Sequence, residues 1–150
     1  SGQVMTTGSN NTFLGYAATP SGATVSNQMT LGNSAVSSLR CQVQTISSLS
    51  DARDKTDIVN SPYGLDFIDT LKPRQFKWES REGGVAFEGE TKLGFIAQEL
   101  LEAADGNNDV LDLVYEENPD KLEAKYGNLI PVLVKAVQEL SNKVKELENK

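Results

Sequence analysis

The chain has 150 residues, enough for one domain or two small ones, and carries 14 basic and 21 acidic side chains, a net charge of -7. This balance argues against nucleic acid as a partner, and no apolar run reaches the roughly 18 residues that span a bilayer, so no membrane partner is expected either. The single cysteine, Cys41, excludes an intrachain disulfide, and together with the lack of histidine it disfavours a metal site, so we expect no metal and no cofactor. Any general base must be a carboxylate, a lysine or an amine.

Residues 1–49 are poor in charge and contain a repeat with an offset of 17 residues: Leu-Gly-x-x-Ala occurs at 14–18 and again at 31–35. Short apolar pieces with glycine at fixed positions are typical of a parallel β-roll or β-helix, in which each coil stacks on the last. Two repeats bury too little to fold alone, so we expect a longer stem upstream and several chains together. A flexible linker is the alternative. Alternation over 39–43 predicts one more strand, with Cys41 buried.

Residues 56–125 predict a small mixed α/β domain. Ser61 and Pro62 are typical of a helix start, and this helix should continue through Lys72, before Pro73. Alternation over 74–79 predicts a strand whose Phe76 and Trp78 face the core. The remaining expectations are a loop at 80–90, a return strand at 91–96, a helix at 97–104 with Leu100 and Leu101 buried, a turn at 105–108 and a strand at 110–115.

Residues 126–150 predict a coiled-coil helix that starts near Leu129, since Pro131 fits only in a first helical turn. Apolar residues follow one another at spacings of 4 and 3, which is a heptad pattern. Isolated zippers with this composition favour a parallel dimer, but the attached domain can override so short a seam. The alternative is an amphipathic helix packed on its own domain. The predicted seam consists of Tyr126, Ile130, Leu133, Val137, Leu140, Val144 and Leu147.

The composition changes abruptly at 49–55, which read Leu-Ser-Asp-Ala-Arg-Asp-Lys. A serine hydroxyl with a lysine five residues later has the groups of a Ser-Lys dyad. Such spacings are also common by chance, and Ser50 or Asp51 could simply cap a short helix.

The order of these motifs resembles one family: a Gly/Asn-rich coiled stem, the 49–55 motif, Leu-Lys-Pro, Phe-Lys-Trp, Gly-Phe-Ile-Ala-Gln-Glu-Leu, then Tyr-Gly-Asn-Leu-Ile-Pro and the heptads. It is similar to the C-terminal intramolecular chaperone domain of phage tailspike, tail-fibre and neck-appendage proteins, the S74 peptidase family. The resemblance implies a homotrimer of α+β fold, with a β-roll or β-helix stem at 1–49 and a chaperone domain at 50–150. It implies that the domain brings three stems into register and then cuts itself off between Leu49 and Ser50.

By motif position, the resemblance makes Ser50 the nucleophile and Lys55 its partner, with Leu49, Asp51 and Arg53 completing the motif. Ser50 could attack the Leu49 carbonyl through a five-membered ring in an N-to-O acyl shift. Lys55 acts as a base only when neutral, which burial or a nearby cation such as Arg53 favours and an acidic neighbour opposes. Positions five apart face differently in a strand or a helix, so the dyad needs a turn, or Lys55 comes from a neighbouring chain.

The expected partners are therefore copies of the same chain and its own upstream stem, within a phage fibre or spike precursor assembled in the host cytoplasm. The main alternative is a permanent trimerisation cap that never cuts. A transcription factor of the myelin-regulator type carries a related domain, but DNA-binding and membrane-spanning regions are absent from this sequence. A hydrolase acting on a separate substrate is disfavoured, because no carboxylate pair or phosphate loop stands out.

Overall fold

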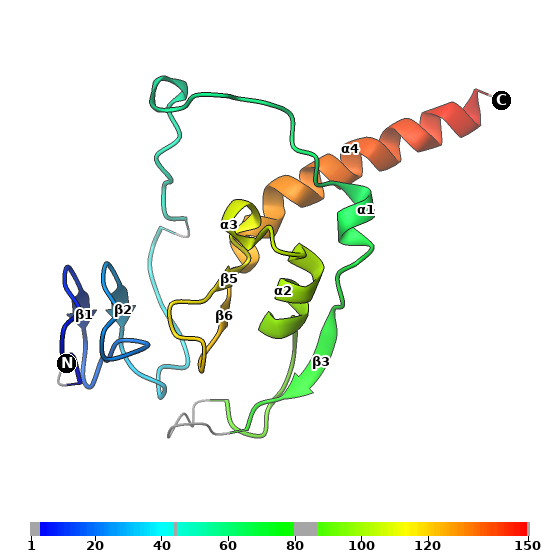
Figure 1. Cartoon of the computed structure of the whole chain (residues 1–150). Helices are drawn as coiled ribbons and strands as arrows, with labels where there is room; N and C mark the ends of the chain where they lie inside the picture. Colours follow the sequence, from blue (N-terminus) through cyan, green and yellow to red (C-terminus); the bar gives the residue numbers. More distant parts are fainter. Residues whose placement is uncertain (1–3, 44, 80–86, 150) are drawn as a thin grey trace.

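A computed structural model describes residues 4–43, 45–79 and 87–149. A small pair of stacked coils lies at the N-terminal end, followed by a long extended arm, a mixed domain and a C-terminal helix that projects away from the domain (Figure 1). None of the helices in these ranges is long and apolar enough to cross a membrane.

The stacked coils follow the 17-residue repeat of the sequence. Strand β1 (Thr12–Leu14) pairs in parallel with β2 (Met29–Leu31), so that Leu14 lies opposite Leu31. Polar side chains repeat the same offset, since the Asn10 side-chain amide donates to the Asn27 side-chain oxygen at 2.7 Å. Gly15 and Gly32 both have positive φ, 114° and 75°, where side-chain-bearing residues are strained. The predicted pairing is confirmed over these two coils, while a longer β-roll stem stays a prediction.

The arm that follows the coils contradicts one prediction. Residues 39–43 form no strand, and Cys41 is exposed rather than buried. The only regular element in the described part of 36–62 is a 3-10 turn, η1 (Ala52–Asp54). Among the residues that the structure describes, no strand lies beside 39–43 to pair with it, and the apolar side chains of this segment are exposed to solvent. Ile46 and Leu49 are 98% and 99% exposed.

The domain is built from short elements. Helix α2 and the two-stranded ladder before it agree with the predictions. In chain order the elements are α1 (Leu65–Ile68), β3 (Arg74–Lys77), β4 (Thr91–Gly94), α2 (Ala97–Ala104), α3 (Asn108–Leu111), β5 (Val114–Tyr115), β6 (Glu123–Ala124), η2 (Tyr126–Asn128) and α4 (Leu129–Glu148). Strands β3 and β4 are antiparallel, as are β5 and β6.

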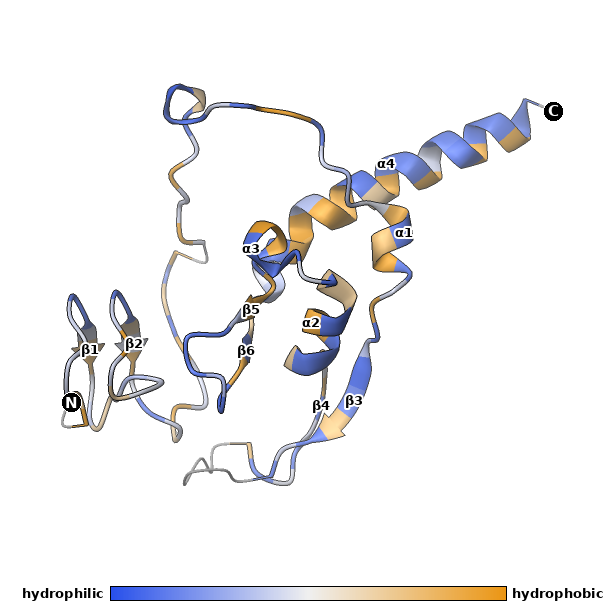
Figure 2. Cartoon of the chain, viewed as in Figure 1, coloured by the Kyte–Doolittle hydropathy of each residue, from blue (hydrophilic) through white to orange (hydrophobic). Residues whose placement is uncertain are grey.

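One apolar core joins these elements. Leu100 of α2 and Leu113, just before β5, are its largest fully buried side chains, and Leu101 is half-buried at its edge. Orange ribbon in Figure 2 marks the apolar residues on α2, α3 and the first part of α4. The buried members are Phe67, Leu100, Ala104, Leu111, Leu113, Val114, Leu129 and Val132.

The predicted helix at 62–72 is much shorter in the structure. It begins at Leu65 and ends at Ile68, and Ser61 does not cap it. Instead, the Ser61 hydroxyl accepts a hydrogen bond from the Tyr63 backbone N–H at 3.1 Å and closes a tight turn. The first N–H of the helix, on Leu65, donates to the Glu139 carboxylate of α4 at 2.8 Å. A long-range cap has replaced the local one, and no short-range sequence pattern encodes it.

Two further predictions need correction. Trp78 is 49% exposed, so it does not lie in the core of this chain, although its ring meets Phe76 edge-on at 5.6 Å. Residues 108–111 form helix α3, and only 114–115 of the predicted strand at 110–115 pair as β5. Asn108 explains why β5 begins so late. Its side-chain oxygen accepts the backbone N–H of Leu113 at 3.1 Å, which folds the end of α3 back toward the start of β5. Residues 80–86 of the predicted loop lie outside the described residues.

Helix α4 begins at Leu129 as predicted and has two apolar faces. Leu129, Val132 and Ala136 are buried against the domain, so the alternative of a helix packed on its own domain holds for the first turns. The seven predicted seam residues are 46–68% exposed: Tyr126, Ile130, Leu133, Val137, Leu140, Val144 and Leu147. The coiled coil therefore stays a prediction, and the face that it needs is uncovered in the single chain.

Candidate functional site

The motif at 50–55 folds into a small turn. Asp51 has an extended backbone, and its Oδ1 accepts the backbone N–H of Arg53 at 2.9 Å, which caps η1. The Lys55 N–H then bonds the Ala52 carbonyl at 3.2 Å and ends the turn. Acidic residues of this type favour such caps because a short side-chain oxygen reaches the N–H two residues ahead.

The turn brings Lys55 back to Ser50. The Lys55 Nζ lies 2.5 Å from the Ser50 Oγ and donates a hydrogen bond to it. Neither a strand nor an α-helix would bring positions five apart together, and η1 provides the turn that the sequence argument required. The contact is made within one chain, so a neighbouring chain is not needed to bring the two groups together.

Arg53 and Asp51 form the second contact of the motif. The guanidinium bonds the carboxylate in a forked pair, Nε to Oδ1 at 3.0 Å and an Nη to Oδ2 at 2.6 Å. This pair lowers the pKa of Asp51, first through the Arg53 side chain and then through its backbone N–H. The charge of Arg53 is thus matched by Asp51, and Arg53 is not an isolated cation beside Lys55.

The whole motif is open to solvent. Ser50, Lys55 and the residues between them are all exposed, and the peptide bond before Ser50 follows the almost fully exposed Leu49. This chain supplies the contact between the hydroxyl and the amine but does not exclude water from it.

Glu139, which the sequence argument missed, ties the end of the arm to α4. It lies beside the start of α1, where a Cβ on Gly64 would fall 2.4 Å from a Glu139 carboxylate oxygen and would push that carboxylate away from the helix start. The Leu65 N–H, and to a lesser degree Lys135, lower the pKa of Glu139. In the local sequence, only Gly64, just before α1, indicates that another group lies close to the helix start. It does not indicate that this group is Glu139.

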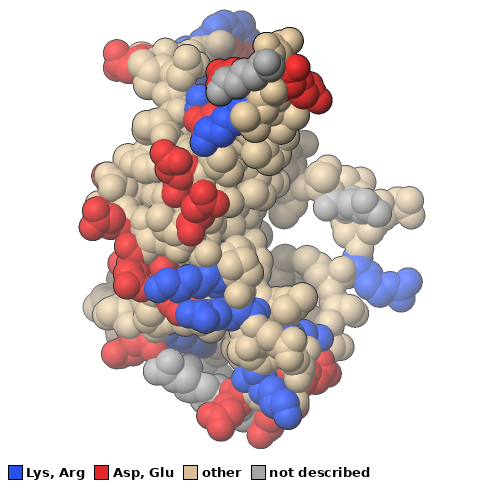
Figure 3. Space-filling view, turned by 90° about the vertical axis from the view of Figure 1, so that its right-hand side faces the viewer, with Lys and Arg blue, Asp and Glu red and all other residues tan. Residues whose placement is uncertain are grey.

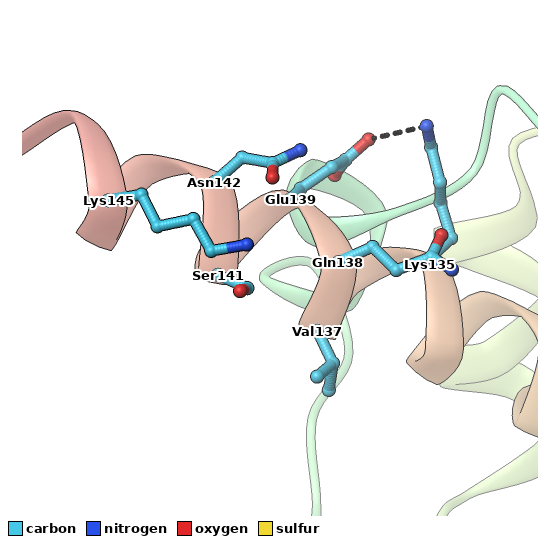
Figure 4. Close-up of a pocket in the computed structure, with 7 residues that line it drawn as sticks. All are labelled: Lys135, Val137, Gln138, Glu139, Ser141, Asn142 and Lys145. Carbon is cyan, nitrogen blue, oxygen red and sulfur yellow. Dashed lines mark ion pairs between the residues drawn. The ribbon is translucent and has the colours of Figure 1, made fainter.

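A shallow hollow lies beside this contact. It is an open depression of about 480 Å³ along α4, lined by Lys135, Val137, Gln138, Glu139, Ser141, Asn142 and Lys145 (Figure 4). Lys135 and Glu139, one turn apart on α4, form an ion pair at 3.4 Å. Acidic side chains gather along the left side of the face drawn in Figure 3, with groups of basic side chains beside them, and the described residues contain no cluster of His, Cys, Asp and Glu that could hold a metal.

Comparison with known proteins gives one match. The family model Peptidase_S74, chaperone of endosialidase, matches residues 50–110. The match begins at Ser50 and extends through the arm, α1, the β3–β4 ladder and α2 into α3. No curated protein and no solved structure matches the chain. The match identifies residues 50–110 as similar to the Peptidase_S74 domain, the chaperone of endosialidase.

Proposed function

We propose that this chain is an intramolecular chaperone that trimerises a phage fibre or spike stem, sets its register and then releases itself by cutting between Leu49 and Ser50. Its partners are two further copies of the chain and its own upstream stem, within a precursor assembled in the host cytoplasm. The observation that carries the proposal is the 2.5 Å contact of Lys55 Nζ with Ser50 Oγ, at the residue where the family match begins.

The chemistry is an N-to-O acyl shift. The Ser50 Oγ attacks the Leu49 carbonyl carbon, and a neutral Lys55 Nζ accepts the hydroxyl proton. As the C–N bond breaks, that proton passes to the nitrogen of Ser50, which leaves a Leu49 ester on Oγ. Water then opens the ester to a Leu49 carboxylate, a Ser50 hydroxyl and a new amino terminus.

The exposure of Lys55 favours a cut that waits for assembly. Burial disfavours the charged form of an amine and so favours the neutral form that can act as a base. The apolar residues around the motif are exposed in the single chain, among them Ile46, Leu49, Ile58 and Val59. Neighbouring chains that cover these residues would also remove water from Lys55, and the dyad would become active only in the assembled trimer.

The need for a chaperone follows from the stem. A parallel repeat offers several pairings displaced by one coil, and finding the correct one among three chains is slow and prone to error. A seam along α4 would hold the three chains at high effective concentration with one starting register. After the cut, the stem would persist because it unfolds slowly.

Denaturing gels of the wild type and of Ser50→Ala test the proposal. Wild type should yield a fragment that begins at Ser50, while Ser50→Ala and Lys55→Ala should stay full length. Asp57→Ala, an exposed change two residues beyond Lys55, is the control and should still cut. Wild type that stays full length under conditions where it is trimeric would instead support the permanent, non-cutting cap.

A further inference from the structure

A contact outside the family match joins the domain to the stem. The β5–β6 connection, residues 116–122, contains a tight turn at its tip. In this turn the Asn118 carbonyl accepts the Lys121 N–H at 3.0 Å. The Asn118 Oδ1 accepts the Asp120 N–H at 3.1 Å, and Pro119 fixes the backbone between them. The bond to Asp120 occupies the side-chain oxygen of Asn118 and so holds the side chain in one orientation, with its Nδ2 pointing away from the turn.

That amide meets the corner of the second stem coil. The half-buried Asn118 donates from Nδ2 to the Ser21 carbonyl at 2.5 Å, across a separation of 97 residues. The approach is close, since a Cβ on Gly22 would lie 3.6 Å from the same nitrogen. We define residues 20–22 as the stem corner.

The stem corner is held in place by the stacking of the coils. Gln28, which precedes β2, accepts the Ser21 N–H at 2.9 Å and donates to the Ser21 hydroxyl at 3.0 Å. Its own backbone N–H donates to Asn11 of the previous coil at 2.9 Å, with the repeat offset of 17 residues. A slipped coil would break the bond between Gln28 and Asn11 and would loosen the corner that Asn118 contacts.

We propose that the Asn118 turn is a docking site for the stem corner and that it binds firmly only when the last two coils are stacked in register. The docking proposal rests on the function proposed above, in which the domain sets the register of the stem. It assigns part of that function to a contact within one chain. The contact does not depend on the peptide bond at Leu49, so it must break after the cut before the domain can leave the stem.

Hydrogen exchange of the uncut Ser50→Ala chain tests the docking without any need for cleavage. Asn118→Ser keeps an oxygen for the turn but cannot reach Ser21, and Asn142→Ser on α4 is the matched control. Exchange at residues 21–28 should be about two- to tenfold faster in Asn118→Ser, the range expected for one lost hydrogen bond, and unchanged in Asn142→Ser. Should Asn118→Ser fail to fold, Asn118→Asp retains the turn oxygen and replaces the donor with an acceptor, and it should show the same faster exchange.

Retention of the cut products gives a second readout. With a tag on the stem, the cut domain fragment should leave the stem more slowly in the wild type than in Asn118→Asp, so more of it should be recovered with the stem soon after the cut. Unchanged exchange at 21–28 in folded Asn118 variants, or unchanged recovery, would overturn the docking proposal. A wild type that never cuts would refute the proposed proteolysis, while the exchange result would still decide on the docking.

Discussion

The seam of α4 offers a prediction whose size follows from the structure. Val137 lies on the predicted seam and is 64% exposed in the single chain. Replacing it by alanine removes two carbons, worth about 0.8 kcal/mol each when buried, so burial of the exposed part should contribute about 1 kcal/mol per chain. A trimer contains three copies, and Val137→Ala should weaken it by about 3 kcal/mol, or about 100-fold in its dissociation constant.

Sedimentation equilibrium of the Ser50→Ala chain measures this directly. Val134→Ala is the matched control, because Val134 is 53% exposed on the same helix but lies outside the heptad spacing. Its effect on the dissociation constant should be several-fold smaller, and circular dichroism should show that both variants keep their helix. Equal effects of the two substitutions on the dissociation constant, or a Ser50→Ala chain that stays monomeric at high concentration, would refute the proposed trimer contact along α4.

Three further predictions concern the domain and the motif. Leu113→Ala should lower the free energy of unfolding by about 2–5 kcal/mol, because this side chain is fully buried, whereas Leu93→Ala, at an 81% exposed site, should cost far less in the same urea titration. The pKa of Glu139 is lowered in the folded chain, so its carboxylate stabilises the fold above the ordinary pKa of 4.5, and this stabilisation is lost as the pH falls through the lower folded-state pKa. The urea midpoints of Glu139→Gln and of the unsubstituted chain should therefore differ at pH 7 and converge in acid. Asp51→Asn keeps an acceptor for the turn but loses the ion pair with Arg53, and it should slow cleavage roughly tenfold without changing the urea midpoint, a result that an unaltered rate in a gel time course would contradict.

Periodic patterns in the sequence predicted several elements correctly. The 17-residue repeat matches the pairing of Leu14 with Leu31, and the apolar spacing with Pro131 placed the start of α4 at Leu129. Such signals are local, so a single sequence contains them in full. The contact of Ser50 with Lys55 was expected only on the condition that a turn lay between them, and Asp51 supplies that turn.

The errors arise where distant residues decide the structure. Ser61 was predicted to start a helix, but Glu139, 74 residues beyond the helix start at Leu65, caps it instead. No local pattern indicates the contact of Asn118, because its partner, Ser21, lies 97 residues away. Trp78 is aromatic and was assigned to the core, yet this chain covers only half of it. Composition and spacing describe neighbours along the chain and cannot identify partners of this kind.

The central claim is that Ser50 cuts the bond before it, and the intact mass of the purified protein tests this most directly. Wild type should give two species, residues 1–49 and 50–150, whose masses sum to that of the whole chain plus one water. Ser50→Ala, prepared in parallel, should give the single mass of the uncut chain. An uncut trimeric wild type, or a Ser50→Ala chain cut at the same bond, would contradict the account.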